Sequence, residues 1–171
     1  MHYTIDDRGG VHYKVDQEFE RNRTSTIAHL NHPRYQNVDA SFQAVQTALD
    51  NAAPDGKAAI RHTFEAAEIL FRLICPKAPR LGGAEINTHL KPLVETLYGS
   101  DLTASRASMK LLASFSDWVD GVHFYRHGQG TEEPTQAPLE IAILTISMGA
   151  SVIRWLAEID QAVLKSQTTD A

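Results

Sequence analysis

The sequence predicts an all-α fold, an antiparallel helical bundle that follows a short N-terminal β-hairpin. Three observations predict it. After residue 17, apolar residues recur every three or four positions over most of the chain, which is the spacing of one helix face. Short stretches rich in Gly and Pro separate these segments, and short connections favour antiparallel neighbours. Only the first 16 residues alternate apolar with polar residues, as a strand does.

The length of 171 residues suits one domain with one hydrophobic core. We therefore expect a single domain over residues 1–171. It would consist of a hairpin at 1–16, a helical bundle at 17–165 and a frayed tail at 166–171.

The hairpin is expected because two short alternating runs flank the turn at Gly9-Gly10. Its apolar positions are Tyr3, Ile5, Val11, Tyr13 and Val15. A lone hairpin is only marginally stable in water, so it should pack on the helices or on a second copy of the chain.

Six amphipathic segments should form the bundle: residues 17–30, 37–50, 57–74, 86–97, 102–126 and 138–163. The last of these is apolar on nearly every side between Leu139 and Leu156, which is typical of a central helix. Because Glu140 and Arg154 lie within this stretch, we expect a buried helix and no membrane span.

Composition limits the classes of function. Hydrophobic residues make up 43% of the chain and charged residues 22%, as in ordinary soluble proteins. The single Cys75 excludes an internal disulfide, and together with the lack of an early apolar run it favours the cytoplasm. A net charge of -5 argues against a broad nucleic-acid surface but leaves room for a local basic groove.

The main candidate site lies at the end of the helix expected over 102–126. His123, Arg126 and His127 stand at i, i+3 and i+4 and share one helix face. One interpretation is structural, since cations are favoured at a helix C-terminus and Gly128 is a good residue to end a helix. The other is catalytic, because an imidazole can move protons near neutral pH while a guanidinium holds a phosphate.

Three further residues flank the apolar face of the helix expected over 57–74: Arg61, Glu65 and Glu68. They could form a solvated charge ladder along that helix. Alternatively, Glu65 or Glu68 could cross to a neighbouring helix and hold Arg126 or His127 in place.

Metal binding is a weaker interpretation of the same cluster. His123 and His127 have the spacing that can put two imidazoles on one ion, with His62, Glu65 or Glu68 as a third ligand. The charge of Arg126 between the two histidines opposes a cation, so we expect neither a metal nor another cofactor.

Two segments together resemble a known family. They are APDGKAAIRHTFEAAEILFRLI at 53–74 and HFYRHGQGTEEPTQAPLEIAILTISMGASVIRWL at 123–156. The combination is similar to the abortive-infection-type (Abi C-terminal-like) proteins of the HEPN superfamily. The resemblance implies a small antiparallel helical bundle that is usually dimeric. Many members are metal-independent ribonucleases of phage-defence, toxin–antitoxin and RNA-processing systems.

The resemblance also implies a site residue and shows a departure from the family motif. Arg126 matches the family's arginine, which is followed after four to six residues by a histidine that completes the site at the dimer interface. Here Thr-Glu-Glu occupies 131–133 and His127 directly follows Arg126. Either the site is rebuilt from His123, Arg126 and His127, or the domain is not catalytic.

Two functions therefore follow from the sequence. The first is a defence or toxin–antitoxin protein that cleaves RNA without a metal. The second is a non-catalytic helical module for dimerisation or for binding RNA or protein, such as a regulatory partner or antitoxin. The expected partners are a second copy in a homodimer, RNA, and a partner protein of a defence or toxin–antitoxin pair.

Overall fold

A computed structural model of the chain describes residues 3–5, 7–126 and 136–169. Most of these residues are helical, which confirms the all-α prediction, and a short hairpin precedes the helices. The elements are β1 Tyr3–Ile5, β2 Val11–Tyr13, α1 Gln17–His29, α2 Gln36–Leu49, α3 Gly56–Ile74, α4 Gly83–Glu85, α5 Lys91–Tyr98, α6 Leu102–Arg126 and α7 Leu139–Thr169. A 3-10 turn over Pro33–Tyr35 precedes α2, and a π turn over Ile86–Leu90 joins α4 to α5.

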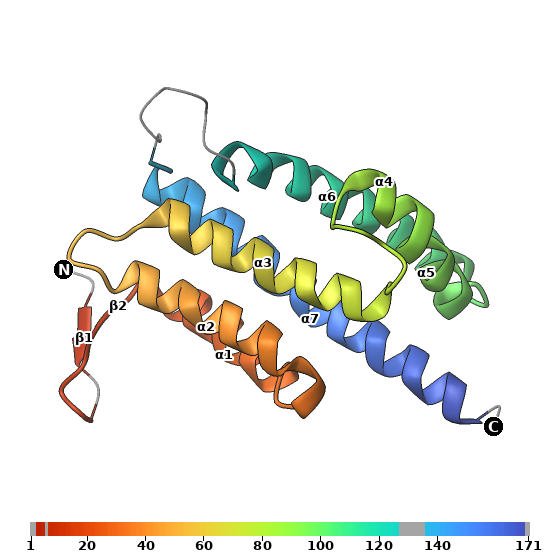
Figure 1. The fold of residues 1–171 in the computed structure, drawn as a ribbon, viewed down its shortest axis with the longest axis horizontal. Coiled ribbons are helices and arrows are strands. Elements are labelled where there is room, and N and C mark those ends of the chain that lie inside the picture. The colour runs from red at the N-terminus through yellow and green to blue at the C-terminus, as the bar shows by residue number, and fades with distance from the viewer. Residues whose placement is uncertain (1–2, 6, 127–135, 170–171) are drawn as a thin grey trace.

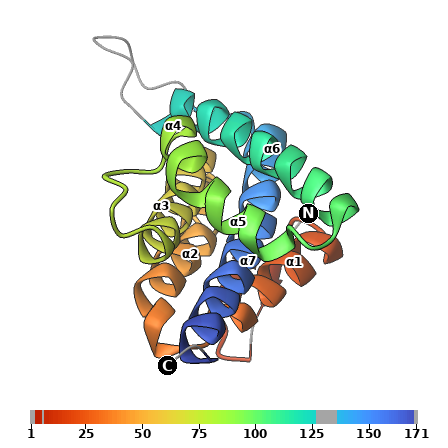
Figure 2. The ribbon, with the colours of Figure 1, turned by 90° about the vertical axis from the view of Figure 1, so that its right-hand side faces the viewer.

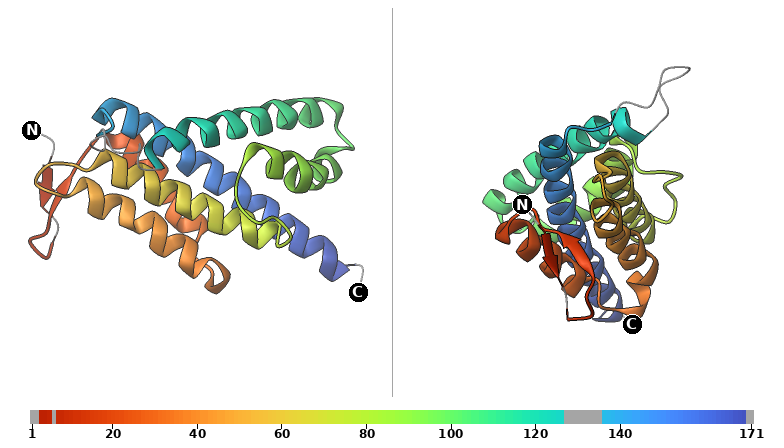
Figure 3. Two further views of the ribbon diagram at one scale, coloured as in Figure 1. Left: turned by 45° about the horizontal axis from the view of Figure 1, so that its top comes forward. Right: turned by 90° about the vertical axis from the view of Figure 1, so that its left-hand side faces the viewer.

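Helices α3 and α7 form the centre of the structure and run in the same direction (Figure 1). Helix α2 packs against α3 and α1 against α7, while α4, α5 and α6 cover the other side (Figures 1 and 2). The consecutive pairs α2–α3 and α6–α7 run in opposite directions (Figure 3). The hairpin and the C-terminal end of α7 lie at opposite ends of the long axis (Figure 1).

Helix α3 forms as its sequence pattern predicts. The Asp55 side chain caps its start by accepting a hydrogen bond from the backbone N–H of Ala58 at 2.9 Å. The apolar side chains that recur along one face, Ile60, Phe64 and Phe71 among them, are buried. This helix therefore supplies the largest share of the core between α2 and α7.

Helices α3, α6 and α7 approach one another closely at Gly149 of α7. A methyl group at this position would collide with Thr63 of α3 and would lie 2.7 Å from Cζ2 of Trp118 on α6. Gly121 offers a contrast, because nothing lies within 4 Å of the place where its Cβ would be.

The change Gly149→Ala should lower the free energy of unfolding by about 1–3 kcal/mol through overpacking. The matched change Gly121→Ala should raise it by about 0.5–1 kcal/mol, because alanine favours the helical backbone. Urea denaturation of the two variants measures both effects. A Gly149→Ala variant as stable as the wild type would show that the three helices do not meet as described.

The hairpin forms as predicted and packs on the end of α2. Its strands pair antiparallel, with Tyr3 opposite Tyr13. The backbone N–H of Tyr13 donates to Oδ1 of Asp50 at 2.6 Å, and Nδ1 of His12 lies 2.7 Å from Oδ2 of the same carboxylate. In the turn, Gly9 has φ +80°, a conformation that favours glycine.

Helix α7 extends further than the sequence analysis expected. We expected a frayed tail from residue 166, whereas the helix continues to Thr169. No Gly or Pro follows Val163, so nothing in the sequence stops the helix. Over Leu139–Ser166, α7 is also long and apolar enough to cross a membrane, and about a third (33%) of its most apolar 18-residue window is buried in the structure.

Candidate functional site

A pocket of about 310 Å³ lies between the C-terminal end of α6 and the loop that joins α3 to α4. Helix α6 contributes two residues of the predicted cluster, His123 and Arg126, and the loop forms the opposite wall. The complete lining is Arg80, Leu81, Gly82, Gly83, Ala84, Glu85, Val119, Asp120, His123 and Arg126.

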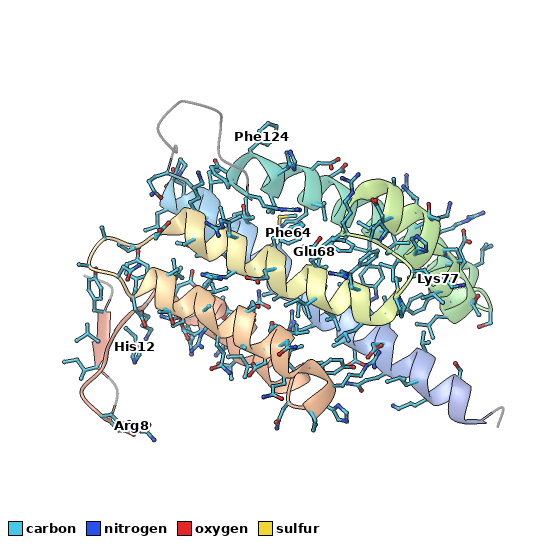
Figure 4. The ribbon with its side chains drawn as sticks, viewed as in Figure 1. Arg8, His12, Phe64, Glu68, Lys77 and Phe124 are labelled. Atoms are coloured by element: carbon cyan, nitrogen blue, oxygen red, sulfur yellow. The ribbon has the colours of Figure 1, made fainter. Side chains whose placement is uncertain are left out.

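Arg126 is held in this pocket by an aromatic ring of α3. Its guanidinium carbon lies 4.3 Å from the centroid of the Phe64 ring, a distance typical of a cation–π contact. Phe64 is only 3% exposed and stacks on Trp118 at 6.3 Å between ring centroids, so the ring itself has little freedom. Figure 4 shows Phe64 on the side of α3 that faces α6. The guanidinium therefore has a defined position at the rim of the pocket.

His123 lies one turn before Arg126, and its side chain is exposed. Because both residues line the same pocket, their helical spacing does bring them together, as we expected. His127, the third member of the predicted cluster, lies outside the described residues.

The three flanking residues of α3 are placed differently from one another. Oε1 of Glu68 accepts a hydrogen bond from the backbone N–H of Leu81 at 2.9 Å, so it fastens the loop that forms the pocket wall (Figure 4). Glu65 is exposed and lies 3.7 Å from Nδ1 of His62. Arg61 is exposed on the same helix. Within the described part of the chain, Arg126 is therefore held by Phe64 and not by Glu65 or Glu68.

Arg80 is a cation of this pocket that the sequence analysis did not select. Its Nε lies 3.0 Å from Oε1 of Glu85. The pKa of Glu85 is lowered by a hydrogen bond from its own backbone N–H and by Arg80, so this carboxyl is ionised at neutral pH.

Charges in the pocket are nearly balanced, because two carboxylates, Asp120 and Glu85, line it together with Arg80 and Arg126. Arg80 is already paired with Glu85. Among the residues that the structure describes, Arg126 contacts an aromatic ring and no carboxylate. An incoming anion would therefore find its strongest attraction at Arg126.

The described residues offer neither a metal-binding cluster nor a reactive thiol. In ranges 3–5, 7–126 and 136–169, no three His, Cys, Asp or Glu side chains lie close enough to hold a metal ion. Burial raises the pKa of Cys75 to about 11, and this thiol is only 5% exposed. Cys75 is thus protonated at neutral pH and unsuited to act as a nucleophile.

A second polar cluster joins the start of α2 to the C-terminal half of α7. Its centre is Asp160, which is 2% exposed. Arg34 donates to both oxygens of this carboxylate, from Nε at 2.7 Å and from Nη2 at 3.0 Å, and the Tyr35 hydroxyl donates at 2.8 Å. The hydrogen bond to Asp160 raises the pKa of Arg34, and burial raises the pKa of Tyr35. Since these groups satisfy one another's hydrogen bonds, we assign this cluster a role in the stability of the fold.

Comparison with known proteins adds no relative. No family model matches the chain, and neither a curated protein nor a solved structure matches it. The interpretation of the site therefore rests on its own geometry and on the two resembling sequence segments.

Proposed function

We propose that this chain is a HEPN-like cytoplasmic protein of a bacterial defence or toxin–antitoxin type system, which cleaves RNA without a metal ion. The observation that carries the proposal is the guanidinium of Arg126, fixed on Phe64 at the rim of a pocket that also contains His123. A positioned guanidinium beside an imidazole is suited to bind and cleave a phosphodiester. The proposal includes RNA as substrate and a homodimer as the working form.

The reaction that suits this pair is attack by the ribose 2′-hydroxyl on the adjacent phosphorus. One imidazole, that of His123 or of His127, accepts the proton of the hydroxyl as the new P–O bond forms. Arg126 binds the non-bridging oxygens, where negative charge increases in the transition state. The bond to the 5′-oxygen breaks, and this oxygen takes a proton from the other imidazole or from water. The products are a 2′,3′-cyclic phosphate and a 5′-hydroxyl end.

Two residues of the opposite wall have supporting roles in this proposal. Arg80 is 70% exposed and can exchange its contact with Glu85 for a second phosphate of the bound strand. Glu68 keeps the loop in place through Leu81. We expect neither residue to exchange protons with the substrate.

The acidic residues of the pocket favour the second candidate function, a non-catalytic module that binds a partner protein. The carboxylates of Glu85 and Asp120 line the same pocket as Arg126. They oppose the approach of a polyanion. With the net charge of -5, this supports a non-catalytic module that binds a partner protein, as the regulatory half of a defence or toxin–antitoxin pair would.

A defined RNA oligonucleotide tests the proposed chemistry. We expect cleavage that continues in EDTA, leaves 2′,3′-cyclic phosphate ends, and stops where a 2′-deoxynucleotide replaces the attacking ribose. The change His123→Ala should slow it by about 10²–10⁴-fold if His123 is the base. His32→Ala, which removes an exposed histidine of the α1–α2 connection, is the matched control and should cleave normally.

The alternatives give different results in this assay. Cleavage that EDTA abolishes would contradict the metal-independent mechanism. Absence of cleavage by pure wild-type protein, at concentrations where it is folded, would favour the partner-binding module.

A further inference from the structure

A groove of about 430 Å³ lies where α1, α6 and α7 meet, and it shares no lining residue with the pocket of Arg126. It is mostly apolar, and its lining includes Phe115 together with both tryptophans of the chain, Trp118 and Trp155. The rings of Phe115 and Trp118 stack with centroids 6.1 Å apart, and both residues are buried. A flat apolar molecule can therefore lie against rings that have little freedom to move.

The donors of this groove are already used within the chain. Nε1 of Trp118 donates to the carbonyl of Thr145 at 2.9 Å, and Nε1 of Trp155 donates to the hydroxyl of Tyr98 at 3.3 Å. Three serine hydroxyls of the groove donate to carbonyls of their own helices, those of Ser114, Ser147 and Ser151. A ligand rich in acceptor atoms would therefore find few donors here.

An unpaired acceptor lies in the part of the lining that α1 contributes. Nδ2 of Asn22 donates to the carbonyl of Ser147 at 2.9 Å. This bond determines the orientation of the amide, because the opposite orientation would place two oxygens against each other. Oδ1 of Asn22 is buried and accepts no hydrogen bond from the described residues. Because buried polar atoms are normally paired, this oxygen favours a ligand that carries an N–H or O–H donor.

A guanidinium without a carboxylate lies beside the same groove. Nη1 of Arg154 donates to Oγ of Ser25 at 3.1 Å, and Nη2 lies 3.4 Å from Oγ of Ser151, which lines the groove. Nε of Arg154 is buried and has no partner among the described residues. Hydroxyl groups do not compensate a positive charge, so an anionic group at this edge of the groove would be stabilised.

We propose that the groove binds a small aromatic carboxylate that carries an N–H donor. Its ring lies against Phe115, Trp118 and Trp155. Its N–H donates to Oδ1 of Asn22, and its carboxylate binds the guanidinium of Arg154. A groove of this volume suits a ligand of one or two fused rings. The inference does not depend on RNA cleavage, since the two sites have separate linings.

Two other classes of small anion fit these contacts less well. A fatty acid has the carboxylate but no donor for Oδ1 of Asn22, and its chain cannot stack on aromatic rings. A nucleotide has ring N–H groups, but its base and sugar carry many acceptor atoms for which the groove has few donors.

Three matched compounds test the proposal by titration of ¹⁵N-labelled protein. Indole-3-acetate has the ring, the N–H and the carboxylate, whereas 1-naphthaleneacetate lacks the N–H and 3-methylindole lacks the carboxylate. Because both tryptophans line the groove, their two indole N–H signals should shift when indole-3-acetate binds. We expect a Kd of about 10 µM–1 mM for this compound. Binding should be about 2–10-fold weaker for 1-naphthaleneacetate and at least about 10-fold weaker for 3-methylindole.

Two variants assign the contacts to residues. Arg154→Ala should weaken the binding of indole-3-acetate by at least about 10-fold and leave that of 3-methylindole unchanged. Asn22→Ala should weaken the binding of indole-3-acetate by about 2–10-fold and leave that of 1-naphthaleneacetate unchanged. Arg106→Ala removes an exposed arginine outside the lining of the groove and should bind all three compounds as the wild type does.

Three results would overturn the proposal. One is the absence of any shift of the tryptophan signals when folded wild type meets millimolar indole-3-acetate. The second is indole-3-acetate that binds no better than 1-naphthaleneacetate or 3-methylindole, or that binds Arg154→Ala as tightly as the wild type. The third is tighter binding of dodecanoate or guanosine monophosphate. The backbone signals of the same spectra show whether each variant is folded, and the comparison of compounds on the wild type requires no variant.

Discussion

Replacing Arg126 by alanine is expected to slow RNA cleavage by about 10²–10³-fold while leaving the fold intact. The guanidinium is fixed on Phe64 and is the cation of the pocket without a carboxylate among the described residues. Removing one preorganised donor to a developing charge typically costs about 10²–10³-fold in rate. The stability should fall by only about 0.5–1 kcal/mol, the worth of a partly exposed cation–π contact, because Trp118 still packs on Phe64.

Two controls make this prediction specific. Arg106→Ala removes the same charge from an exposed position of the same helix, and it should cleave RNA at the wild-type rate. Arg126→Lys keeps the charge but loses the planar fork that binds two phosphate oxygens, so it should restore little activity. Full cleavage activity in Arg126→Ala would show that the pocket takes no part in cleavage. Equal losses of activity in Arg106→Ala and Arg126→Ala would show that the loss comes from the change in overall charge and not from the position of Arg126.

The largest loss of stability is expected from Asp160→Ala. The change leaves the Tyr35 hydroxyl without its buried acceptor and Arg34 without its carboxylate. Breaking a buried ion pair costs about 3–5 kcal/mol. Arg34 is 32% exposed and can be partly solvated, so we expect about 2–4 kcal/mol. Urea denaturation measures the loss, and Asp117→Ala, at an exposed position of α6, should change stability by less than about 0.5 kcal/mol.

The same cluster has a pH signature. Burial raises the pKa of Tyr35 in the folded state, so folding favours the neutral phenol. Its contribution is complete below the ordinary tyrosine pKa of about 10 and is lost as the pH rises further. In Tyr35→Phe, the unfolding free energy should therefore decrease less than in the wild type as the pH rises above about 10.

An Asp160→Ala variant as stable as the wild type would contradict the structural role of the cluster.

Periodicity in the sequence was enough to predict α1, α2, α3, α6 and α7. The helix expected over 86–97 is instead divided into the π turn Ile86–Leu90 and α5, and the short α4 before it was not expected. The face of α3 is buried as its spacing indicates, and the alternation around Gly9 does form a hairpin. The end of α7 was predicted too early, because polar residues alone do not stop a helix that lacks Gly or Pro.

The candidate site was only partly predictable. His123 and Arg126 share a pocket because both lie on one helix, and helical spacing can be read from the sequence. Arg80 lines the pocket from the loop after α3, and Phe64 contacts Arg126 from α3, so both positions depend on packing that no local pattern encodes. The pair of Arg34 and Asp160 was missed for the same reason, since 126 positions separate the two residues in the chain.

Exposed apolar side chains on α7 show why the apolar pattern of this helix overestimated its burial. An all-round apolar helix was expected to be fully central, yet one of its faces lies outside the core at Leu144 and Met148. Hydrophobicity alone does not distinguish a core from a contact with a second molecule. Only the packing of α7 against α1 and α3 separates the two faces.

Metal-independent RNA cleavage at Arg126 is tested most directly by incubating a mixed cellular RNA pool with purified protein in EDTA, beside the Arg126→Ala/His127→Ala double variant. We expect the wild type to cleave the RNA and the folded double variant to leave it intact. Cleavage by the double variant at the wild-type rate would contradict this expectation, and so would a wild type that cleaves only when a divalent metal is supplied.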